Sequence, residues 1–441
     1  MGRTARKELP PGSHLPPAGQ TLALWKSPFT YLEQCRSSYG SNFTIRATSR
    51  PPLIFLSAPN EIKEIFRTPA EVLHPGEGGG TVTPIVGESS FMLADEGEHL
   101  NARKVILPPF HTRVVREHAD LVAEVAQREI ASWPRDVALA LHPRLRALTL
   151  EIILRTILGA SGRLTDRRLH ALRDRLLKML SVTASAVFPE PLLRHGAGRA
   201  IWRGFLRERA EVDELIYAII EDRCREQDVS GDLLGMLLAA RNTDGSRMTP
   251  CQVRDNLMSI VLAGHETTAA ELAWAFQLLA HNPRVLNRLI DEIDGDGGDE
   301  EYLTATIQEV LRHRPVFLFA IPRAVKQPIE IGGWSYRPPT QLLGCIYLVH
   351  HDPELYPEPQ EFRPERFLEC SPTTYTWLPW GGGRKRCPGV HLAMLEMKTV
   401  LRTVLATMTV RPAAKKIEHP RWRSVIVTPH AGSRVILSRR R

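Results

Sequence analysis

A cysteine between glycines stands near the C-terminal end of the chain. Cys387 lies in the run Pro-Trp-Gly-Gly-Gly-Arg-Lys-Arg-Cys-Pro-Gly, residues 379–389, directly before an apolar segment at 390–407 that reads as a helix. Backbone N–H groups and the positive end of that helix favour the ionised sulfur. Such a thiolate can be the axial ligand of a haem iron, and glycines permit close approach to the flat macrocycle. The alternative is a buried packing residue, the usual role of free cysteine.

A long apolar stretch in the middle of the chain predicts a helix that holds a second reactive group. Thr249 and Pro250 are typical of a helix start, and Pro283 predicts the end of the helix at Asn282. The segment is apolar almost all round, so we expect it to be buried through the centre of the molecule.

The run 263–268 inside this helix combines a glycine, an acid and an alcohol. Gly264 removes a side chain where something flat must lie close, and a local widening of the helix there would form a notch for dioxygen and water. Glu266 and Thr267 could pass protons into such a notch. The alternative is a core helix whose threonine bonds to a backbone carbonyl. His265 and Thr268 are interpreted as structural.

The cysteine run resembles the haem-binding loop of the cytochrome P-450 family, F-x-x-G-x-x-x-C-x-G. The matching positions are Trp380, Gly383, Cys387 and Gly389. The family usually has Phe where this chain has Trp380. It also has Arg or His facing a haem propionate where this chain has Lys385, which keeps the charge but loses the bidentate fork. Neither change removes the sulfur ligand.

The central helix resembles the same family's oxygen-activation motif, Ala or Gly, Gly, any residue, Asp or Glu, Thr. Ala263, Gly264, Glu266 and Thr267 match it. The resemblance implies that Ala263 and Gly264 lie beside haem b (iron protoporphyrin IX). It also implies that Glu266 and Thr267 are the catalytic residues.

Three further patterns match the family in the right order. Glu309 and Arg312 have the spacing of an ordinary surface ion pair. The resemblance implies instead a buried triad with Arg366, in the run Phe362 to Phe367, that fixes the thiolate loop. It also implies that His99 and Arg103, four residues apart on one helical face, bind a haem propionate, as does Arg323.

The resemblance locates the substrate pocket only roughly. Candidate lining residues are Val316, Phe317, Phe319 and Ala320, together with the loop at 75–93. The glycines of 74–80 suggest a mobile loop, which in this family lies over the pocket, although a plain surface loop fits as well. The segment 180–215 should form the roof of the pocket.

Composition fits a globular protein. The 441 residues have a net charge of +8 and no nucleic-acid-binding motif, so a basic face suits an acidic protein partner instead. Six scattered cysteines suit a reducing cytosol. Residues 1–20 read as a flexible, proline-rich lead-in without signal peptide or membrane anchor, and 21–441 as a single domain. We expect a cytoplasmic monomer.

The expected fold is mainly α with small β-sheets (α+β), the cytochrome P-450 fold. Helices are predicted at 28–39, 59–67, 98–114, 301–314 and about 390–408, and hairpins at 42–56 and around Gly332-Gly333. A strand pair is expected near 435–437.

The expected activity is that of a haem-thiolate monooxygenase acting on a hydrophobic small molecule, in secondary metabolism. Electrons should come from a separate ferredoxin or flavodoxin with its reductase, since the chain has no spare length for a flavin domain; the basic run 384–386 suits such an acidic partner. The alternatives are a peroxygenase, an oxidase that couples aromatic rings by radical chemistry, and a non-enzymatic haem sensor. Glu266 and Thr267 speak against a peroxygenase, because hydrogen peroxide brings its own protons.

Overall fold

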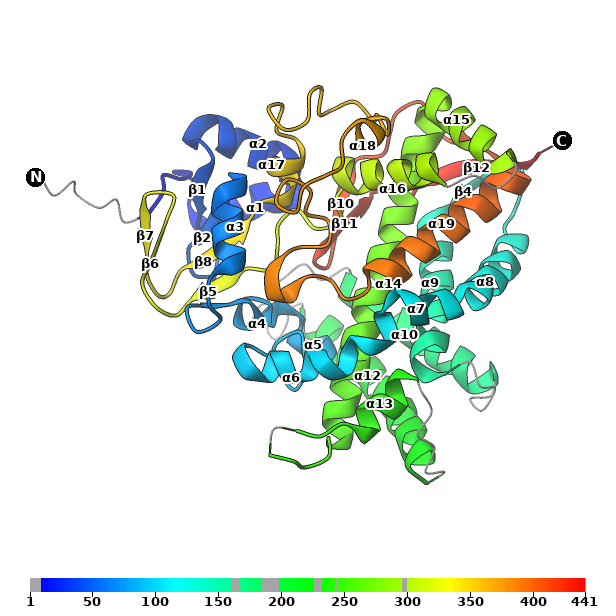
Figure 1. Ribbon diagram of the computed structural model, residues 1–441, viewed down its shortest axis with the longest axis horizontal. Coiled ribbons are helices and arrows are strands. Elements are labelled where there is room, and N and C mark those ends of the chain that lie inside the picture. Colours follow the sequence, from blue (N-terminus) through cyan, green and yellow to red (C-terminus); the bar gives the residue numbers. More distant parts are fainter. Residues whose placement is uncertain are drawn as a thin grey trace, which may run out of the picture.

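Helices dominate the structure (Figure 1), a computed structural model that describes residues 9–159, 166–184, 198–225, 232–242, 244–295 and 300–440. The described helices are α1 (Pro17–Lys26), α2 (Pro28–Tyr39), α3 (Pro59–Arg67), α4 (Pro75–Gly78), α5 (Thr83–Val86), α6 (Glu96–Ile106), α7 (Thr112–Glu117), α8 (Ala119–Ala131), α9 (Leu141–Leu158), α10 (Asp166–Ala184), α12 (Gly198–Arg225), α13 (Leu233–Ala239), α14 (Pro250–His281), α15 (Pro283–Asp294), α16 (Glu301–His313), α17 (Ile346–His350), α18 (Arg366–Glu369) and α19 (Val390–Thr407).

The strands form small sheets. The largest has the order β1-β2-β8-β5-β3 and lies on the N-terminal side of the molecule; β4-β12-β9 form a three-stranded sheet, and β10-β11 and β6-β7 form hairpins (Figure 1). The described strands are β1 (Asn42–Ile45), β2 (Leu53–Leu56), β3 (Leu73–His74), β4 (Ala138–Ala140), β5 (Arg323–Val325), β6 (Ile329–Ile331), β7 (Trp334–Tyr336), β8 (Gln341–Gly344), β9 (Met408–Pro412), β10 (Pro420–Arg423), β11 (Ile426–Pro429) and β12 (Arg434–Arg439).

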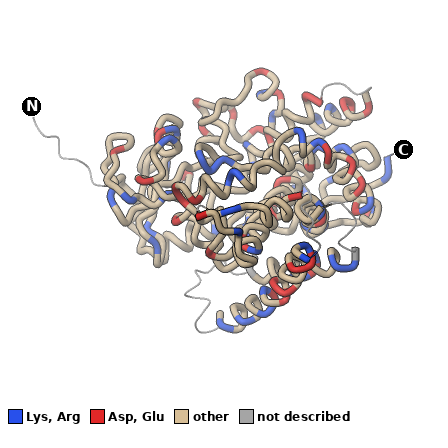
Figure 2. The backbone as a smooth tube through the Cα atoms, turned by 60° about the horizontal axis from the view of Figure 1, so that its bottom comes forward, with Lys and Arg blue, Asp and Glu red and all other residues tan. Residues whose placement is uncertain are grey.

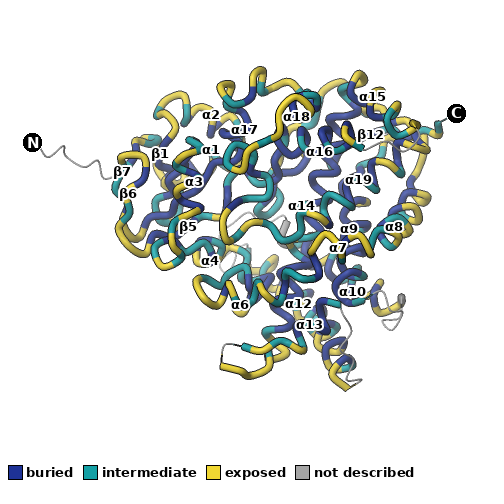
Figure 3. Tube along the Cα trace, in the orientation of Figure 1, coloured by how far each residue is buried: buried dark blue, intermediate teal, exposed yellow. Residues whose placement is uncertain are grey.

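Helix α14 crosses the centre of the fold, as its composition predicts. Thr249 and Gln252 form a capping box, Pro250 occupies the first turn, and the helix ends at His281, before Pro283. These local signals satisfy the N–H groups at the first turn and prevent continuation at the last. Most of α14 is buried (Figure 3), and it packs most extensively against α9. The predicted central helix is confirmed.

The shorter predicted elements also appear. The strands of the first hairpin pair from Asn42 with Leu56 to Ile45 with Leu53, and β6 and β7 flank Gly332-Gly333. The C-terminal strand pairs with β9 and β4. The helix expected at 98–114 is divided into α6, a 3-10 turn at Pro108–Phe110 and α7, because two prolines interrupt it.

Two expectations about the N-terminal part need correction. The boundary drawn at residue 20 falls inside α1, and Gly12 already pairs with Thr44 of β1, so the last part of the lead-in lies against the body. The glycine-rich run 74–80 is a short helix and turn. A Cβ on Gly76 would lie 2.2 Å from the Leu93 carbonyl oxygen, and one on Gly78 would lie 1.7 Å from that of Pro322. These glycines permit close backbone packing rather than provide mobility.

Charge is spread over the molecule. Basic and acidic residues are interspersed along the backbone rather than gathered in separate blocks (Figure 2). Within the described residues, no helix is long and apolar enough to cross a membrane.

Candidate active site

The cysteine loop packs under α3. Gly383 has φ +64°, and a Cβ there would lie 2.5 Å from the Phe66 carbonyl oxygen. A Cβ on Gly382 would lie 2.4 Å from the ring of the same phenylalanine. The loop closes where the Cys387 N–H donates to the Trp380 carbonyl at 2.9 Å. The glycine spacing is therefore required by a tight turn against a neighbouring helix.

The surroundings of the sulfur suit a ligating thiolate. Cys387 is partly exposed, and Gly389 is the residue before the first turn of α19. Burial raises the pKa of the free Cys387 thiol, whereas the Gly389 N–H and the charges of Arg103 and Arg386 lower it. A bound metal ion would add a larger charge in the same direction and hold the sulfur ionised.

One face of α14 is open although the rest of the helix is buried. Ala263 is exposed, and Leu262, Gly264 and Thr267 are partly exposed, in the middle of the otherwise buried helix. The Thr267 hydroxyl donates to the Ala263 carbonyl at 2.6 Å. The predicted local widening is wrong, because α14 continues as an α-helix through this region.

Gly264 serves a different neighbour from the one expected. A Cβ at this position would lie 3.0 Å from the Ile153 Cδ1 atom of α9. Its missing side chain therefore lets α9 pack closely on α14, whereas Ala263 is the small residue on the open face. The glycine–alanine pair gives the helix one tight face and one open face.

Glu266 is held by two arginines. Its Oε1 atom lies 2.7 Å from Arg146 Nε and 2.6 Å from Arg146 Nη2, and its Oε2 atom lies 3.4 Å from Arg423 Nε. Burial alone would raise the pKa of this carboxyl, but contact with His265 and the charges of Arg146 and Arg423 lower it to about 2. The carboxylate is ionised as it stands and must loosen an ion pair before it carries a proton.

Two histidines complete this distal cluster, which we define as Glu266, Arg146, Arg423, His265 and His142. His265 Nε2 lies 3.5 Å from Glu266 Oε1. Burial lowers the pKa of His265 to about 4 and that of His142 to about 3, so both are neutral at physiological pH. The cluster therefore combines one negative and two positive charges.

A separate group of basic residues lies between α6, β5 and the cysteine loop. His99, Arg323 and Lys385 line one small cavity with Arg384 and Asp95. Burial lowers the pKa of His99 to about 4 and that of Arg323 to about 10. The His99 Nε2 atom is buried without a hydrogen-bond partner in the described residues.

Lys385 and Arg103 tie this cavity to neighbouring backbone. Lys385 Nζ donates to the carbonyls of Met92 at 3.0 Å and Ala94 at 2.6 Å, and burial lowers its pKa to about 8. Arg103 Nη2 donates to the Arg386 carbonyl at 2.8 Å. The amine of Lys385 is therefore turned inward, whereas its neighbours Arg384 and Arg386 are exposed on the surface of the loop.

These features fit a haem. The sulfur lies in a turn whose glycines allow close approach, α14 presents a small residue and a hydroxyl, and the cavity beside α6 has more cations than carboxylates. The orphaned His99 nitrogen and the buried Arg323 suit the propionates of the macrocycle. The residues present therefore match the group that the cysteine motif implies.

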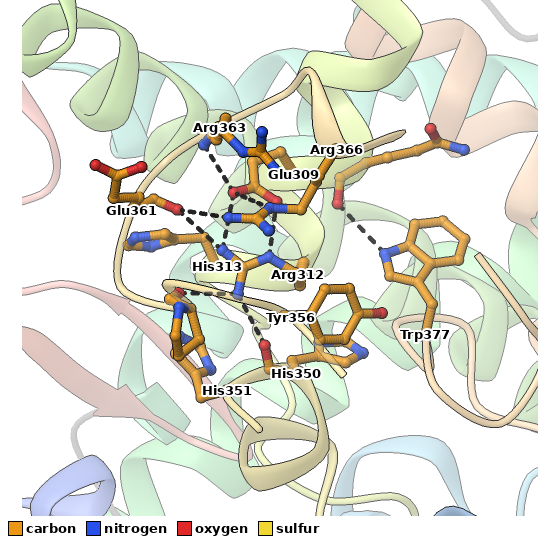
Figure 4. A network of polar contacts seen from close by, with 12 residues as sticks. Glu309, Arg312, His313, His350, His351, Tyr356, Glu361, Arg363, Arg366 and Trp377 are labelled. Carbon is orange, nitrogen blue, oxygen red and sulfur yellow. Dashed lines mark hydrogen bonds and ion pairs between the residues drawn. The ribbon is translucent and has the colours of Figure 1, made fainter. Parts of the chain in front are cut away.

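The predicted triad is present (Figure 4), and all three of its side chains are buried. Arg312 Nε and Nη2 bind the two Glu309 oxygens at 2.7 and 2.8 Å, and Arg366 Nε binds Glu309 Oε1 at 3.2 Å. Neither Glu309 nor Arg312 has any exposed side-chain surface. The remaining N–H groups of the two arginines donate to the backbone carbonyls of His350, Pro357, Glu358, Pro359 and Glu361.

The candidate pocket residues lie on the segment between α16 and β5. The Val316 N–H donates to Glu271 Oε1 of α14 at 3.1 Å, and its carbonyl accepts from the Val427 N–H of β11 at 2.9 Å. Phe319 is partly exposed and packs on Trp422, with ring centroids 6.3 Å apart. Phe317 is also partly exposed, whereas Ala320 is buried. The pocket segment is thus fastened to α14 and to the β10-β11 hairpin.

Part of the expected roof, 185–197, lies outside the described residues. The flanking helices α10 and α12 pack against each other. Sequence reasoning missed Arg146 and Arg423. The available signal for Arg146 was an arginine in the largely apolar helix 141–158.

Comparison with known proteins agrees with this geometry. The family model for cytochrome P450 matches residues 9–436. The putative cytochrome P450 135B1 of Mycobacterium tuberculosis is 35% identical over 443 residues, covering 99% of this chain and 92% of that protein. The putative cytochrome P450 137 of the same species is 35% identical over 399 residues, covering 90% of this chain and 83% of that protein.

Solved structures show the same fold. A retinoic acid-bound cyanobacterial CYP120A1 has a TM-score of 0.83 at 22% identity, with 98% of this chain and all of the other covered. The haem domain of cytochrome P450DA also has a TM-score of 0.83 at 22% identity, with 99% of each chain covered. The chain belongs to the cytochrome P450 family. It is therefore a haem-thiolate oxidoreductase of the monooxygenase class, with haem b as its cofactor.

Proposed function

We propose that Cys387 is the axial ligand of the haem and that the open face of α14 is where dioxygen is activated for insertion of one oxygen atom into a hydrophobic substrate. The placement of the sulfur at the N-terminus of α19, in a turn that only glycines can form, carries this proposal. The bound haem supplies the redox chemistry. Ala263 would line its distal side, with Gly264 next to it packed on α9, while His99, Arg103, Arg323 and Lys385 would hold its propionates.

Each protein group has a distinct task in this proposal. Thr267 holds a hydroxyl on the open face, 2.6 Å from the Ala263 carbonyl, where it can orient a proton donor. Glu266 receives protons from solvent only when its contact with an arginine loosens. The triad of Glu309, Arg312 and Arg366 holds the backbone that leads to the cysteine loop. Val316, Phe317, Phe319 and Ala320 border the substrate.

Members of this family require a redox partner and bind hydrophobic substrates. The partner is proposed to be a ferredoxin or flavodoxin with its reductase, docking near the exposed Arg384 and Arg386. A monomer, a cytoplasmic location and a role in secondary metabolism stay predictions. Radical coupling of the substrate is the alternative reaction; the protons needed to reduce dioxygen to water could then come from the substrate's own hydroxyl groups instead of Thr267.

Replacement of the sulfur tests the proposal. Cys387→Ser should abolish the thiolate-type absorption of the reduced, carbon monoxide-bound protein, because oxygen is a much weaker ligand than thiolate sulfur. Cys345→Ser, at a buried cysteine with its Sγ atom 3.6 Å from the Leu318 carbonyl, is the matched control and should keep that absorption. A thiolate-type spectrum in the Cys387 variant would show that another residue binds the iron.

A further inference from the structure

The distal cluster has more positive than negative charge, with Arg146 buried and Arg423 partly buried. Arg146 and Arg423 share the single carboxylate of Glu266, and both neighbouring histidines are neutral. No second carboxylate contacts either arginine in the part of the chain that the structure describes. A buried charge without a partner is costly unless an anion or a set of oriented dipoles compensates it.

Backbone carbonyls compensate the arginines of the triad but not those of the distal cluster. Besides Glu266, Arg146 has only the Ser181 hydroxyl, at 3.4 Å, and Arg423 has no other polar partner among the described residues. The triad also has two arginines and one glutamate, yet its guanidinium groups bind several backbone carbonyls. The same charge ratio therefore leaves unused donors only at the distal cluster.

Arg423 can be reached by a ligand, and its strand touches the candidate pocket segment. Its side chain is 24% exposed, against 8% for Arg146. It is the last residue of β10, directly after Trp422, which packs on Phe319. Its guanidinium lies against Glu266, the residue before Thr267 on α14. The strand that carries Arg423 thus contacts the pocket segment, and the guanidinium itself contacts the residue next to the proposed reaction site.

We propose that the substrate is a hydrophobic carboxylic acid whose carboxylate binds Arg423, with Arg146 supporting it through Glu266. This inference rests on the proposed function, since it assigns a substrate class to the same pocket. A carboxylate would neutralise the surplus charge and accept two parallel N–H hydrogen bonds from the guanidinium. Its apolar part would extend along Phe319 and Val316, and it would be oriented by the charged end.

The test compares acids with their neutral amides. The ferric haem protein is titrated with dodecanoic acid and dodecanamide, and with phenylbutanoic acid and phenylbutanamide. Binding is followed by the change in haem spin state and by calorimetry. At least one acid should bind about tenfold more tightly than its amide, as expected for a charge-assisted pair. Equal affinities within both pairs, or no binding of either acid, would overturn the proposal.

Variants locate the carboxylate. Arg423→Gln should remove the preference for the acid, and Arg423→Lys should keep part of it. Arg439→Gln, which removes a charge from an exposed position on β12, should keep all of it. A preference that persists in Arg423→Gln would place the carboxylate elsewhere and overturn the proposal. The acid–amide comparison in the unmodified protein stands even if a variant does not fold.

The two proposals fail in different ways. A protein with a thiolate-type spectrum, and with spin-state shifts for the amides alone, contradicts only the assignment of an acidic substrate. A thiolate-type spectrum that persists in Cys387→Ser contradicts the assignment of the haem ligand, and that result is independent of Arg423.

Discussion

Two clusters in this protein contain one glutamate and two arginines, and they behave differently. The triad of Glu309, Arg312 and Arg366 joins α16 to α18, with its side chains almost fully buried and its spare N–H groups bound to carbonyls. The distal cluster around the buried Glu266 lies beside the open face of α14 and leaves donors unused. Composition does not distinguish the two clusters; the completeness of their hydrogen bonding does.

The difference follows from what surrounds each glutamate. The segment 357–363 wraps around Arg312 and Arg366 and presents its carbonyls to them (Figure 4). The Arg363 backbone N–H also donates to Glu309 at 2.9 Å. Glu266 is instead surrounded by side chains from α9 and from the tip of a hairpin. Side chains can rearrange around a ligand more readily than a wrapped backbone can.

The largest effect is expected when the sealed cluster is opened. Arg366→Ala should destabilise the protein by about 3–5 kcal/mol and yield protein that accumulates poorly or loses haem, because a buried carboxylate loses a partner. Arg363→Ala is the control, since that side chain pairs with Glu369 near the surface. Haem content and thermal unfolding measure the difference. Equal behaviour of the two variants would show that the triad adds no more than a surface ion pair.

The surroundings of the triad should also be sensitive to acid, through His350, whose carbonyl binds Arg312. Burial, aided by Arg312, lowers the pKa of His350 to about 3 from its ordinary 6.5, and its Nε2 atom accepts the Leu378 N–H at 2.8 Å. As the pH falls, His350 binds a proton in the unfolded chain before it does so in the folded protein. Its contribution to the free energy of unfolding is therefore complete above pH 6.5 and is lost progressively from pH 6.5 towards pH 3. His350→Asn should therefore flatten the free energy of unfolding against pH by about 1.4 kcal/mol per unit in this range.

Denaturant titrations at several pH values measure that slope. His430→Asn, at an exposed position after β11, controls for the loss of an imidazole. An unchanged slope in His350→Asn would mean that acid acts on the protein away from the triad.

A smaller and more selective effect is expected at the open face. Thr267→Ala should keep haem and substrate binding, because the hydroxyl contributes little packing, but product formed per electron pair should fall on the order of tenfold. Electron consumption should continue and yield hydrogen peroxide. Thr267→Ser should restore most of the coupling. An unchanged yield of product per electron pair in the alanine variant would favour radical joining of the substrate over oxygen insertion.

Features encoded by neighbouring residues could be predicted from the sequence. The start and end of α14 depend on Thr249, Pro250 and Pro283, and each of these residues affects only the adjacent helical turn. The cysteine loop and the triad were predictable from the family's motifs. Gly76 and Gly78 were misjudged, because glycine signals either mobility or close packing and only the tertiary contact decides.

The environment of Glu266 could not be predicted in this way. Arg146 lies 120 residues before Glu266 in the chain, and Arg423 comes from a strand near the C-terminus. No local pattern links such residues; only the packing of α9 and the β10-β11 hairpin on α14 brings them together. The structure therefore adds Arg146 and Arg423 as partners of Glu266. These two positive charges are the reason to consider anionic substrates.

The most direct test makes the same substitution in both clusters. Glu309→Gln should yield protein with little haem and a markedly lower unfolding temperature, because two sealed arginines lose their counter-charge. Glu266→Gln should retain haem and most of the stability, since the partly exposed Arg423 can turn to solvent, while coupling of electrons to product falls. Haem content and the unfolding temperature, measured side by side, decide the matter. Equal loss in both variants would contradict the division into a structural and a functional cluster.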